Sequence, residues 1–81
     1  MWNLYIVNCR DNTFYTGITN NLKLRIKNHN CGKGCRYTRS RYPVKLVYSQ
    51  KFPTKSKALK REIQIKKLIR LQKIKLIESN S

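Results

Sequence analysis

The chain has 81 residues and carries 19 Lys and Arg side chains against 3 Asp and Glu, a formal net charge of +16. This length fits one small domain, residues 1–81, and excludes multidomain enzymes and cofactor folds of Rossmann size. No apolar stretch reaches the roughly 18–20 residues of a membrane span, and so many mutually repelling cations favour a polyanionic partner, above all nucleic acid.

The N-terminal part of the chain predicts a β-hairpin. Residues 2–8 are rich in β-branched and aromatic types and predict a strand, polar residues 10–13 predict a turn, and residues 14–16 predict the returning strand. Side chains alternate between the two faces of a strand. We therefore expect Tyr5 and Tyr15 to share a face only if the loop has an odd number of residues.

A short helix and a basic loop follow the hairpin. Apolar residues four apart predict a helix over about residues 20–30, with Thr19 or Asn20 as its N-cap and Gly32 as its stop. Residues 31–43 are basic, with tyrosines between the cations, and predict a surface loop.

The second half of the chain predicts one more strand and a longer helix. Residues 44–52 alternate between apolar and polar types, which predicts a strand with one half-buried face. Thr54 is a suitable N-cap for a helix over about residues 55–70, and the short apolar tail near residues 74–77 is expected to fold back onto the core. The order β-β-α-β-α, with a short C-terminal helix, predicts an α+β domain with a small, mainly antiparallel three-stranded sheet. The apolar face of the third strand is expected to contain Val44, Leu46, Tyr48 and Phe52.

The acidic residues are informative because there are so few of them. Glu62 stands alone in a basic stretch, at a position where the helical spacing places an inward-facing stripe. A carboxylate facing inward is costly unless it is paired or binds a metal. An ion pair with Lys66, four residues further on, explains it equally well. The stripe consists of Ala58, Glu62, Ile65 and Ile69.

Two further groups of residues can carry chemistry. Arg25 and His29 are four residues apart on the predicted short helix and share a face. Arginine suits bidentate phosphate contacts, and histidine carries protons near neutral pH. The plainer interpretations are a solvated cation for Arg25, a residue stabilised by the helix dipole for His29, and ordinary core positions for Tyr5 and Tyr15.

The three cysteines cannot form a fully paired disulfide framework. No secretion signal precedes Cys9, Cys31 and Cys35, so we expect a reducing, cytoplasmic environment. A zinc site built from these cysteines and His29 is disfavoured, because their spacing matches no common zinc pattern.

Short segments placed in order along about residues 2–77 carry a family resemblance. They comprise residues 4–6, 14–19, 22–26, 29–30, 32–34, 36–39, 43–47, 58–62 and 66–68. Each segment is weak alone, but their order and separations resemble the GIY-YIG nuclease domain, specifically its small standalone type. The chain departs from the family pattern at Asn3, near the expected first glycine, and at Thr16, where the second motif has isoleucine.

This resemblance implies a metal-dependent endonuclease that hydrolyses phosphodiester bonds in DNA with low sequence specificity, without a small-molecule cofactor. By the same analogy, Glu62 binds Mg²⁺ (or Mn²⁺), and Arg25 stabilises the charge that develops on the phosphate. Tyr5 helps to deprotonate the attacking water, while Tyr15 and His29 position that water or share its proton. The alternative is a DNA- or RNA-binding protein with little or no catalysis.

The basic residues of the loop and the second helix are the expected nucleic-acid contacts, with DNA favoured over RNA. Tyr37 or Tyr42 is expected to stack on an unpaired base. Binding to a membrane surface is disfavoured, because the basic helix needs its apolar face for the core. The expected contact residues are Lys33, Arg36, Tyr37, Arg39, Arg41 and Lys66.

Overall fold

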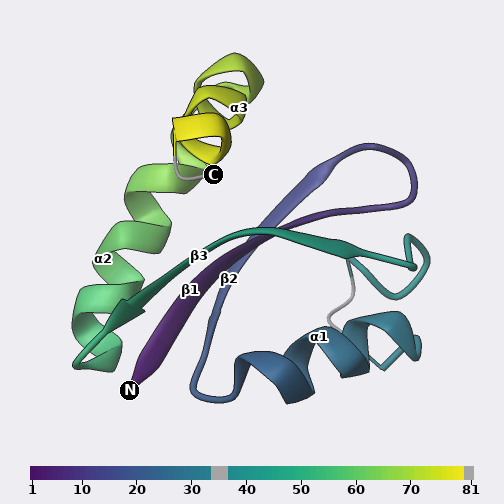
Figure 1. The fold of residues 1–81 in the computed structure, drawn as a ribbon, viewed down its shortest axis with the longest axis horizontal. Helices are drawn as coiled ribbons and strands as arrows, with labels where there is room; N and C mark the ends of the chain where they lie inside the picture. The colour runs from purple at the N-terminus through teal and green to yellow at the C-terminus, as the bar shows by residue number, and fades with distance from the viewer. Residues whose placement is uncertain (34–36, 80–81) are drawn as a thin grey trace.

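A three-stranded antiparallel sheet separates α1 from α2 in the computed structural model, which describes residues 1–33 and 37–79 (Figure 1). The strands lie in the order β2-β1-β3. The elements are β1 (Trp2–Asn8), β2 (Phe14–Thr19), α1 (Leu22–Asn30), β3 (Lys45–Phe52), α2 (Lys55–Lys66) and α3 (Arg70–Ser79). The predicted α+β class and element order are confirmed.

The hairpin between β1 and β2 places both tyrosines on one face. The amide of Cys9 donates a hydrogen bond to the carbonyl oxygen of Thr13 at 2.8 Å, which closes a loop over the residues between them. Asn12 ends this loop with a φ of 66°, a conformation that asparagine tolerates better than most residues. The resulting register puts Tyr5 and Tyr15 on the same side of the sheet, as an odd loop requires.

Each face of the sheet has its own apolar layer. Leu4 and Ile6 of β1 are fully buried against Ile65 of α2. The alternate residues Tyr5 and Val7 face the opposite way and pack against apolar side chains of α1. The alternation of a single buried strand therefore assigns α1 and α2 to opposite faces.

The prediction that the apolar residues of the third strand all lie on one face is wrong at the start of the strand. The pairing of β3 with β1 shifts by one residue at Val47, a β-bulge that breaks the alternation of side chains. Val44 consequently packs on the α1 side, whereas Tyr48 and Phe52 pack on the α2 side. Leu46, which we expected to be inward, is 38% exposed.

The short helix begins at Leu22, two residues after the expected start near residue 20. Its N-cap is Asn21, whose side-chain oxygen accepts a hydrogen bond from the amide of Leu24 at 3.2 Å. Neither Thr19 nor Asn20 caps it, because the Thr19 hydroxyl accepts instead from the amide of Asn21 at 3.1 Å. Gly32 follows the helix with a φ of 75°, as the predicted stop signal requires.

The helix predicted over residues 55–70 is shorter than expected, and the short C-terminal helix predicted after it is α3. Thr54 caps α2 as expected, but α2 ends at Lys66, and the amide of Ile69 donates to the Gln72 side chain at the start of α3. Ile69 is 64% exposed, so it does not belong to the inward stripe. The break lets α3 return its apolar tail to the α2-side core, where Leu76 and Ile77 pack.

Candidate active site

Four of the predicted site residues meet on the α1 face of the sheet. Tyr5 and Tyr15 come from paired strands, and Arg25 and His29 come from successive turns of α1. The Tyr5 hydroxyl lies 3.0 Å from His29 Nε2 and accepts a hydrogen bond from Arg25 Nε at 3.3 Å. The Tyr15 ring centre lies 5.7 Å from that of His29 and 6.4 Å from that of Tyr5.

Gly17 makes room for this cluster. It lies opposite Tyr5 in the hairpin. A Cβ atom at Gly17 would lie 2.7 Å from the Tyr5 hydroxyl oxygen and 3.2 Å from the ring of Tyr15. Tyr5 is held by two hydrogen bonds and cannot withdraw without losing them, so the glycine is required by close packing.

His29 is completely buried at the centre of the cluster. Desolvation, reinforced by the positive charge of Arg25, lowers the pKa of His29 below its ordinary value of 6.5. The imidazole is therefore neutral at physiological pH, and one ring nitrogen is an acceptor. Its Nδ1 atom lies 2.5 Å from the hydroxyl oxygen of Thr38.

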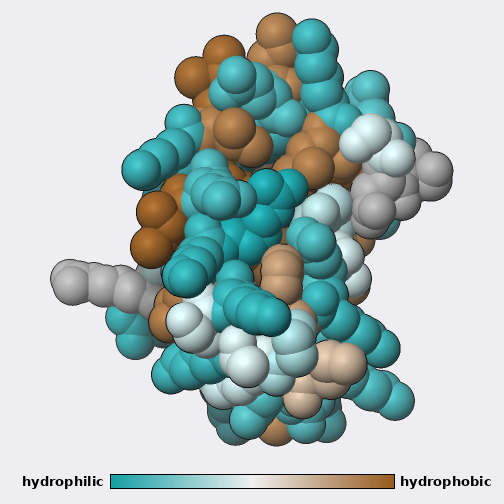
Figure 2. Space-filling model, turned by 90° about the vertical axis from the view of Figure 1, so that its left-hand side faces the viewer, coloured by the Kyte–Doolittle hydropathy of each residue, from teal (hydrophilic) through white to brown (hydrophobic). Residues whose placement is uncertain are grey.

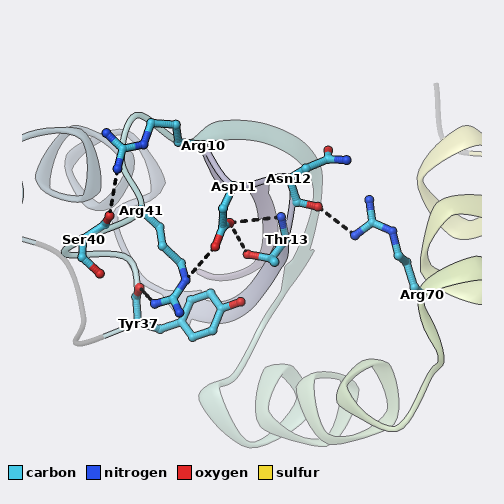
Figure 3. A network of polar contacts seen from close by, with 8 residues as sticks. All are labelled: Arg10, Asp11, Asn12, Thr13, Tyr37, Ser40, Arg41 and Arg70. Atoms are coloured by element: carbon cyan, nitrogen blue, oxygen red, sulfur yellow. Dashed lines mark hydrogen bonds and ion pairs between the residues drawn. The ribbon is translucent and has the colours of Figure 1, made fainter.

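The loop after α1 lies over the tyrosines. Tyr37 stacks on Tyr15, with ring centres 5.7 Å apart and an interplanar angle of 24°. The guanidinium carbon of Arg41 lies 4.2 Å from the centre of the Tyr37 ring. Arg41 also forms a 2.9 Å ion pair with Asp11 in the hairpin turn, which ties the loop to the sheet (Figure 3).

The hairpin turn is an anchor for two other parts of the chain (Figure 3). Hydrogen bonds from Thr13 lower the pKa of Asp11, with a smaller contribution from Arg41. Arg10 donates to the carbonyl oxygen of Ser40 in the loop at 3.4 Å. On the other side, Arg70 of α3 donates to the carbonyl oxygen of Asn12 at 2.8 Å. The turn therefore fixes the loop that covers the site.

Glu62 lies in a different layer from the other four residues. It is on α2, which packs against the opposite face of the sheet, and its side chain is 16% exposed. Its neighbours on the stripe, Ala58 and Ile65, are fully buried, so this side of α2 is inward-facing. Its carboxylate forms a 3.8 Å ion pair with Lys66. The structure thus assembles the tyrosine–arginine–histidine cluster without bringing Glu62 into its hydrogen bonds.

The cysteines do not assemble with the histidine. Within residues 1–33 and 37–79, no three His, Cys, Asp or Glu side chains lie close enough to hold a metal ion together. Cys9 is buried in the α1-side core, and Cys31 is exposed. Cys35 lies outside the described residues.

The predicted nucleic-acid contacts differ in how available their charges are. Lys33 and Arg39 are exposed. Lys66 is 53% exposed and pairs with Glu62, while the guanidinium of Arg41 is already engaged by Asp11 and Tyr37. Arg36 lies outside the described residues.

Hydrophilic side chains cover most of the face on the α2 side, and hydrophobic ones show between them toward the end where α3 lies (Figure 2). In the part of the chain that the structure describes, every helix is too short or too polar to cross a membrane.

Two residues of this arrangement were missed by sequence reasoning. Thr38 is buried beside His29, although it lies in a loop for which the sequence predicts only nucleic-acid contacts. A loop has no periodicity, so no pattern marked Thr38 as inward-facing. Asp11 was assigned to the turn, but its ion pair with Arg41 joins residues far apart in sequence, which local patterns do not reveal.

Comparisons with known proteins show the family of this chain. The model of the GIY-YIG catalytic domain matches residues 1–75. A UPF0213 protein of Staphylococcus haemolyticus is 53% identical over 75 residues, covering 93% of this chain and 92% of that protein. A UPF0213 protein of Clostridium perfringens is 56% identical over 78 residues, covering 96% and 84%.

Solved structures show the same fold. The solution NMR structure of a UPF0213 protein from Bacillus halodurans aligns with a TM-score of 0.62 and 42% identity, covering 96% of this chain and 84% of that one. The solution NMR structure of a protein from E. faecalis aligns with a TM-score of 0.64 and 38% identity, covering 95% of this chain and 82% of that one. The clustered tyrosines, arginine and histidine thus occur in a chain that belongs to the GIY-YIG catalytic domain family.

Proposed function

We propose that this protein is a divalent-metal-dependent endonuclease that hydrolyses phosphodiester bonds in DNA with low sequence specificity. The observation that carries the proposal is the buried Tyr5 hydroxyl, held between the cation of Arg25 and the neutral imidazole of His29. A core tyrosine needs one hydrogen-bond partner. Tyr5 has two: Arg25, which is always charged, and His29, which can accept a proton. This combination suits acid–base chemistry.

The residues of the cluster have distinct roles in this proposal. An ordinary phenol has a pKa of about 10 and is a poor base at neutral pH. A guanidinium beside the oxygen favours the deprotonated phenol, so Arg25 supports Tyr5 as the group that takes a proton from water. Arg25 is also suited to stabilise negative charge developing on the phosphate, and Tyr15 borders the His29 ring and helps to position the water.

The family resemblance implies a divalent metal, and Glu62 is the residue of this chain suited to hold it. Its donor is a carboxylate oxygen, mostly withdrawn from solvent. Mg²⁺ prefers oxygen ligands and is often bound through one or two carboxylates together with waters. When bound, the ion would polarise the phosphate and stabilise the leaving oxygen.

One observation favours a second candidate function, nucleic-acid binding without catalysis. Lys66 forms an ion pair with the carboxylate of Glu62. This ion pair alone can explain why α2 carries an acidic residue at this position, without a bound metal. The net charge of +16 suits a binder as well as an enzyme.

The variant Glu62→Gln distinguishes the two functions. Wild type, Glu62→Gln and Glu78→Gln would be incubated with duplex, nicked, branched, flap and single-stranded substrates, with Mg²⁺, with Mn²⁺ and with EDTA. We expect Glu62→Gln to lower the cleavage rate by about 100-fold or more, since even the loss of an outer-shell partner can cost about 10- to 100-fold. Its affinity for DNA should stay the same or rise, because a negative charge is removed from a basic surface.

Glu78→Gln is the matched control. It makes the same chemical change at an exposed position near the end of α3, and we expect cleavage at the wild-type rate. Unchanged cleavage by Glu62→Gln would contradict the role of this carboxylate. A wild-type protein that binds DNA or RNA but cuts no substrate with either metal would establish the binding function instead.

A further inference from the structure

Thr38 is an unusual residue for its position in the chain. It lies in the basic loop after α1, where the neighbouring residues Arg39 and Ser40 are exposed, yet it is 0% exposed itself. Its hydroxyl oxygen lies 2.5 Å from Nδ1 of His29, which is also 0% exposed. Two completely buried polar groups from separate segments therefore meet directly within the candidate site.

The contacts on the other side of the imidazole favour one direction for this hydrogen bond. Tyr5 is in contact with Arg25 Nε and with His29 Nε2. Arginine can only donate, so of these two groups His29 Nε2 is the one that can accept the phenol proton. In a neutral imidazole, Nε2 is an acceptor only when the proton is on Nδ1.

We propose that Thr38 is a positioning residue that selects the tautomer of His29. Its oxygen accepts the Nδ1 proton, and Nε2 is thereby left unprotonated toward the Tyr5 hydroxyl. This inference rests on the proposed nuclease function for its catalytic consequence, but the tautomer is a property of the protein without substrate.

The proposed series of hydrogen-bonded side chains transfers one proton, from Tyr5 to His29. The O–H bond of Tyr5 breaks, its electron pair stays on the phenol oxygen, and the proton forms a bond to His29 Nε2. The products are a phenolate beside Arg25 and an imidazolium whose Nδ1–H still donates to Thr38. In the other tautomer Nε2 already carries a proton, so His29 cannot accept this one.

The surroundings of His29 are consistent with a single tautomer. Among residues 1–33 and 37–79, the groups that face it are Arg25 on α1, Tyr5 on β1, Tyr15 on β2 and Thr38 on the loop. Burial favours the neutral ring, and a buried N–H without an acceptor is costly. A hydroxyl at Thr38 gives the Nδ1 proton that acceptor.

The experiment compares Thr38→Val, which keeps the shape and removes the hydroxyl, with Thr38→Ser, which keeps the hydroxyl. The chain has 1 histidine, so the two imidazole ¹⁵N signals of uniformly labelled protein belong to His29 alone. At pH 7.5, without DNA or metal, we expect the Nδ1–H tautomer in wild type and Thr38→Ser. In Thr38→Val we expect a shift toward Nε2–H.

Cleavage kinetics with Mg²⁺ supply the second measurement. Thr38→Val should lower kcat by about 10-fold or more and change KM by less than about twofold, since misplacing a proton acceptor affects the chemical step. Thr38→Ser should recover most of kcat, which a general packing defect would not predict.

Several results would overturn the proposal. One is the Nε2–H tautomer in wild type, a measurement that needs no variant and stands even if Thr38→Val does not fold. Another is an unchanged tautomer in folded Thr38→Val, and a third is an equal loss of kcat in both variants. If wild type shows the Nδ1–H tautomer and no cleavage, the proposed nuclease function fails while the assignment of the tautomer holds.

Discussion

His29 illustrates how the fold converts an ordinary side chain into a specialised one. Its position four residues after Arg25 follows from the helix, but its complete burial follows from the sheet, α1 and the loop together. Desolvation is the main cause of its lowered pKa, and the charge of Arg25 adds to it. Protonation of the imidazole would also disturb the contact to Tyr5, because Nε2 would then be a donor facing a hydroxyl oxygen that already accepts from Arg25.

This burial predicts that the protein becomes less stable below about pH 6.5. The unfolded chain protonates His29 near its ordinary pKa of 6.5, whereas the folded chain does so only at lower pH. Between these two pKa values the unfolded state holds more protons, so the free energy of unfolding falls as pH decreases, by at most about 1.4 kcal/mol per pH unit. Above pH 6.5 the contribution is fully present.

Urea unfolding at pH 5, 6, 7 and 8 measures this dependence. His29→Gln removes the titrating group, so its stability should vary less over the same range. Asp11, whose pKa is also lowered, affects a separate window at and below its ordinary value of 3.8. Identical pH profiles for wild type and His29→Gln would contradict the assignment.

At the scale of the elements, α2 packs on the sheet through a narrow stripe of buried residues. Ala58 and Ile65, seven residues apart, are both fully buried against the sheet, while Ile63 on another side of the helix is 54% exposed. The stripe ends with α2, because the helix breaks before α3 (Figure 1). Apolar residues of α3 pack against the same core. The contribution of this helix to stability is therefore concentrated at few positions.

Two isoleucines on α2 provide a matched test of this conclusion. Ile65→Ala should lower the free energy of unfolding by about 2–5 kcal/mol, because it removes buried methyl groups and leaves a cavity. Ile63→Ala makes the same change at an exposed position and should stay within about 0.5 kcal/mol of wild type. Urea denaturation of both variants under one condition measures the difference, and equal effects would mean that α2 does not pack on the sheet through Ile65.

At the scale of the whole molecule, charge dominates. A net charge of +16 on a chain of 81 residues opposes compaction and attracts polyanions. Part of the charge is used internally, since Arg41 pairs with Asp11, Arg70 lies over the Phe14 ring and Lys66 pairs with Glu62. Exposed cations such as Lys33 and Arg39 remain available to phosphates.

The affinity for duplex DNA should therefore depend strongly on salt. The logarithm of the binding constant should fall linearly with the logarithm of the salt concentration, by about 0.9 for each phosphate neutralised. Arg39→Gln should reduce this slope by about one if Arg39 contacts a phosphate. Ser40→Ala, an uncharged change in the same loop, should leave the slope unchanged. Fluorescence anisotropy over a range of KCl concentrations measures both variants, and an unaltered slope in Arg39→Gln would remove this residue from the interface.

Much of the cluster could be predicted from the sequence, because it depends on local periodicity. Alternation along a strand and the parity of the hairpin loop decide that Tyr5 and Tyr15 share a face. The repeat of the α-helix decides that Arg25 and His29 do so too. These relations follow from backbone geometry over a few residues, so one amino-acid sequence is enough to predict them.

The tertiary structure decided the relations that no local repeat contains. A bulge at Val47 moved Val44 to the opposite face of the sheet from Tyr48, and a break after α2 exposed Ile69. The family resemblance places Glu62 and Arg25 at the same phosphate, and only the folded chain shows that α2 holds Glu62 on the other side of the sheet. Only the folded chain brings Thr38 of the loop to the imidazole of His29. Packing between two segments that are distant in sequence depends on the shapes of both segments, and the sequence pattern of either segment alone does not show it.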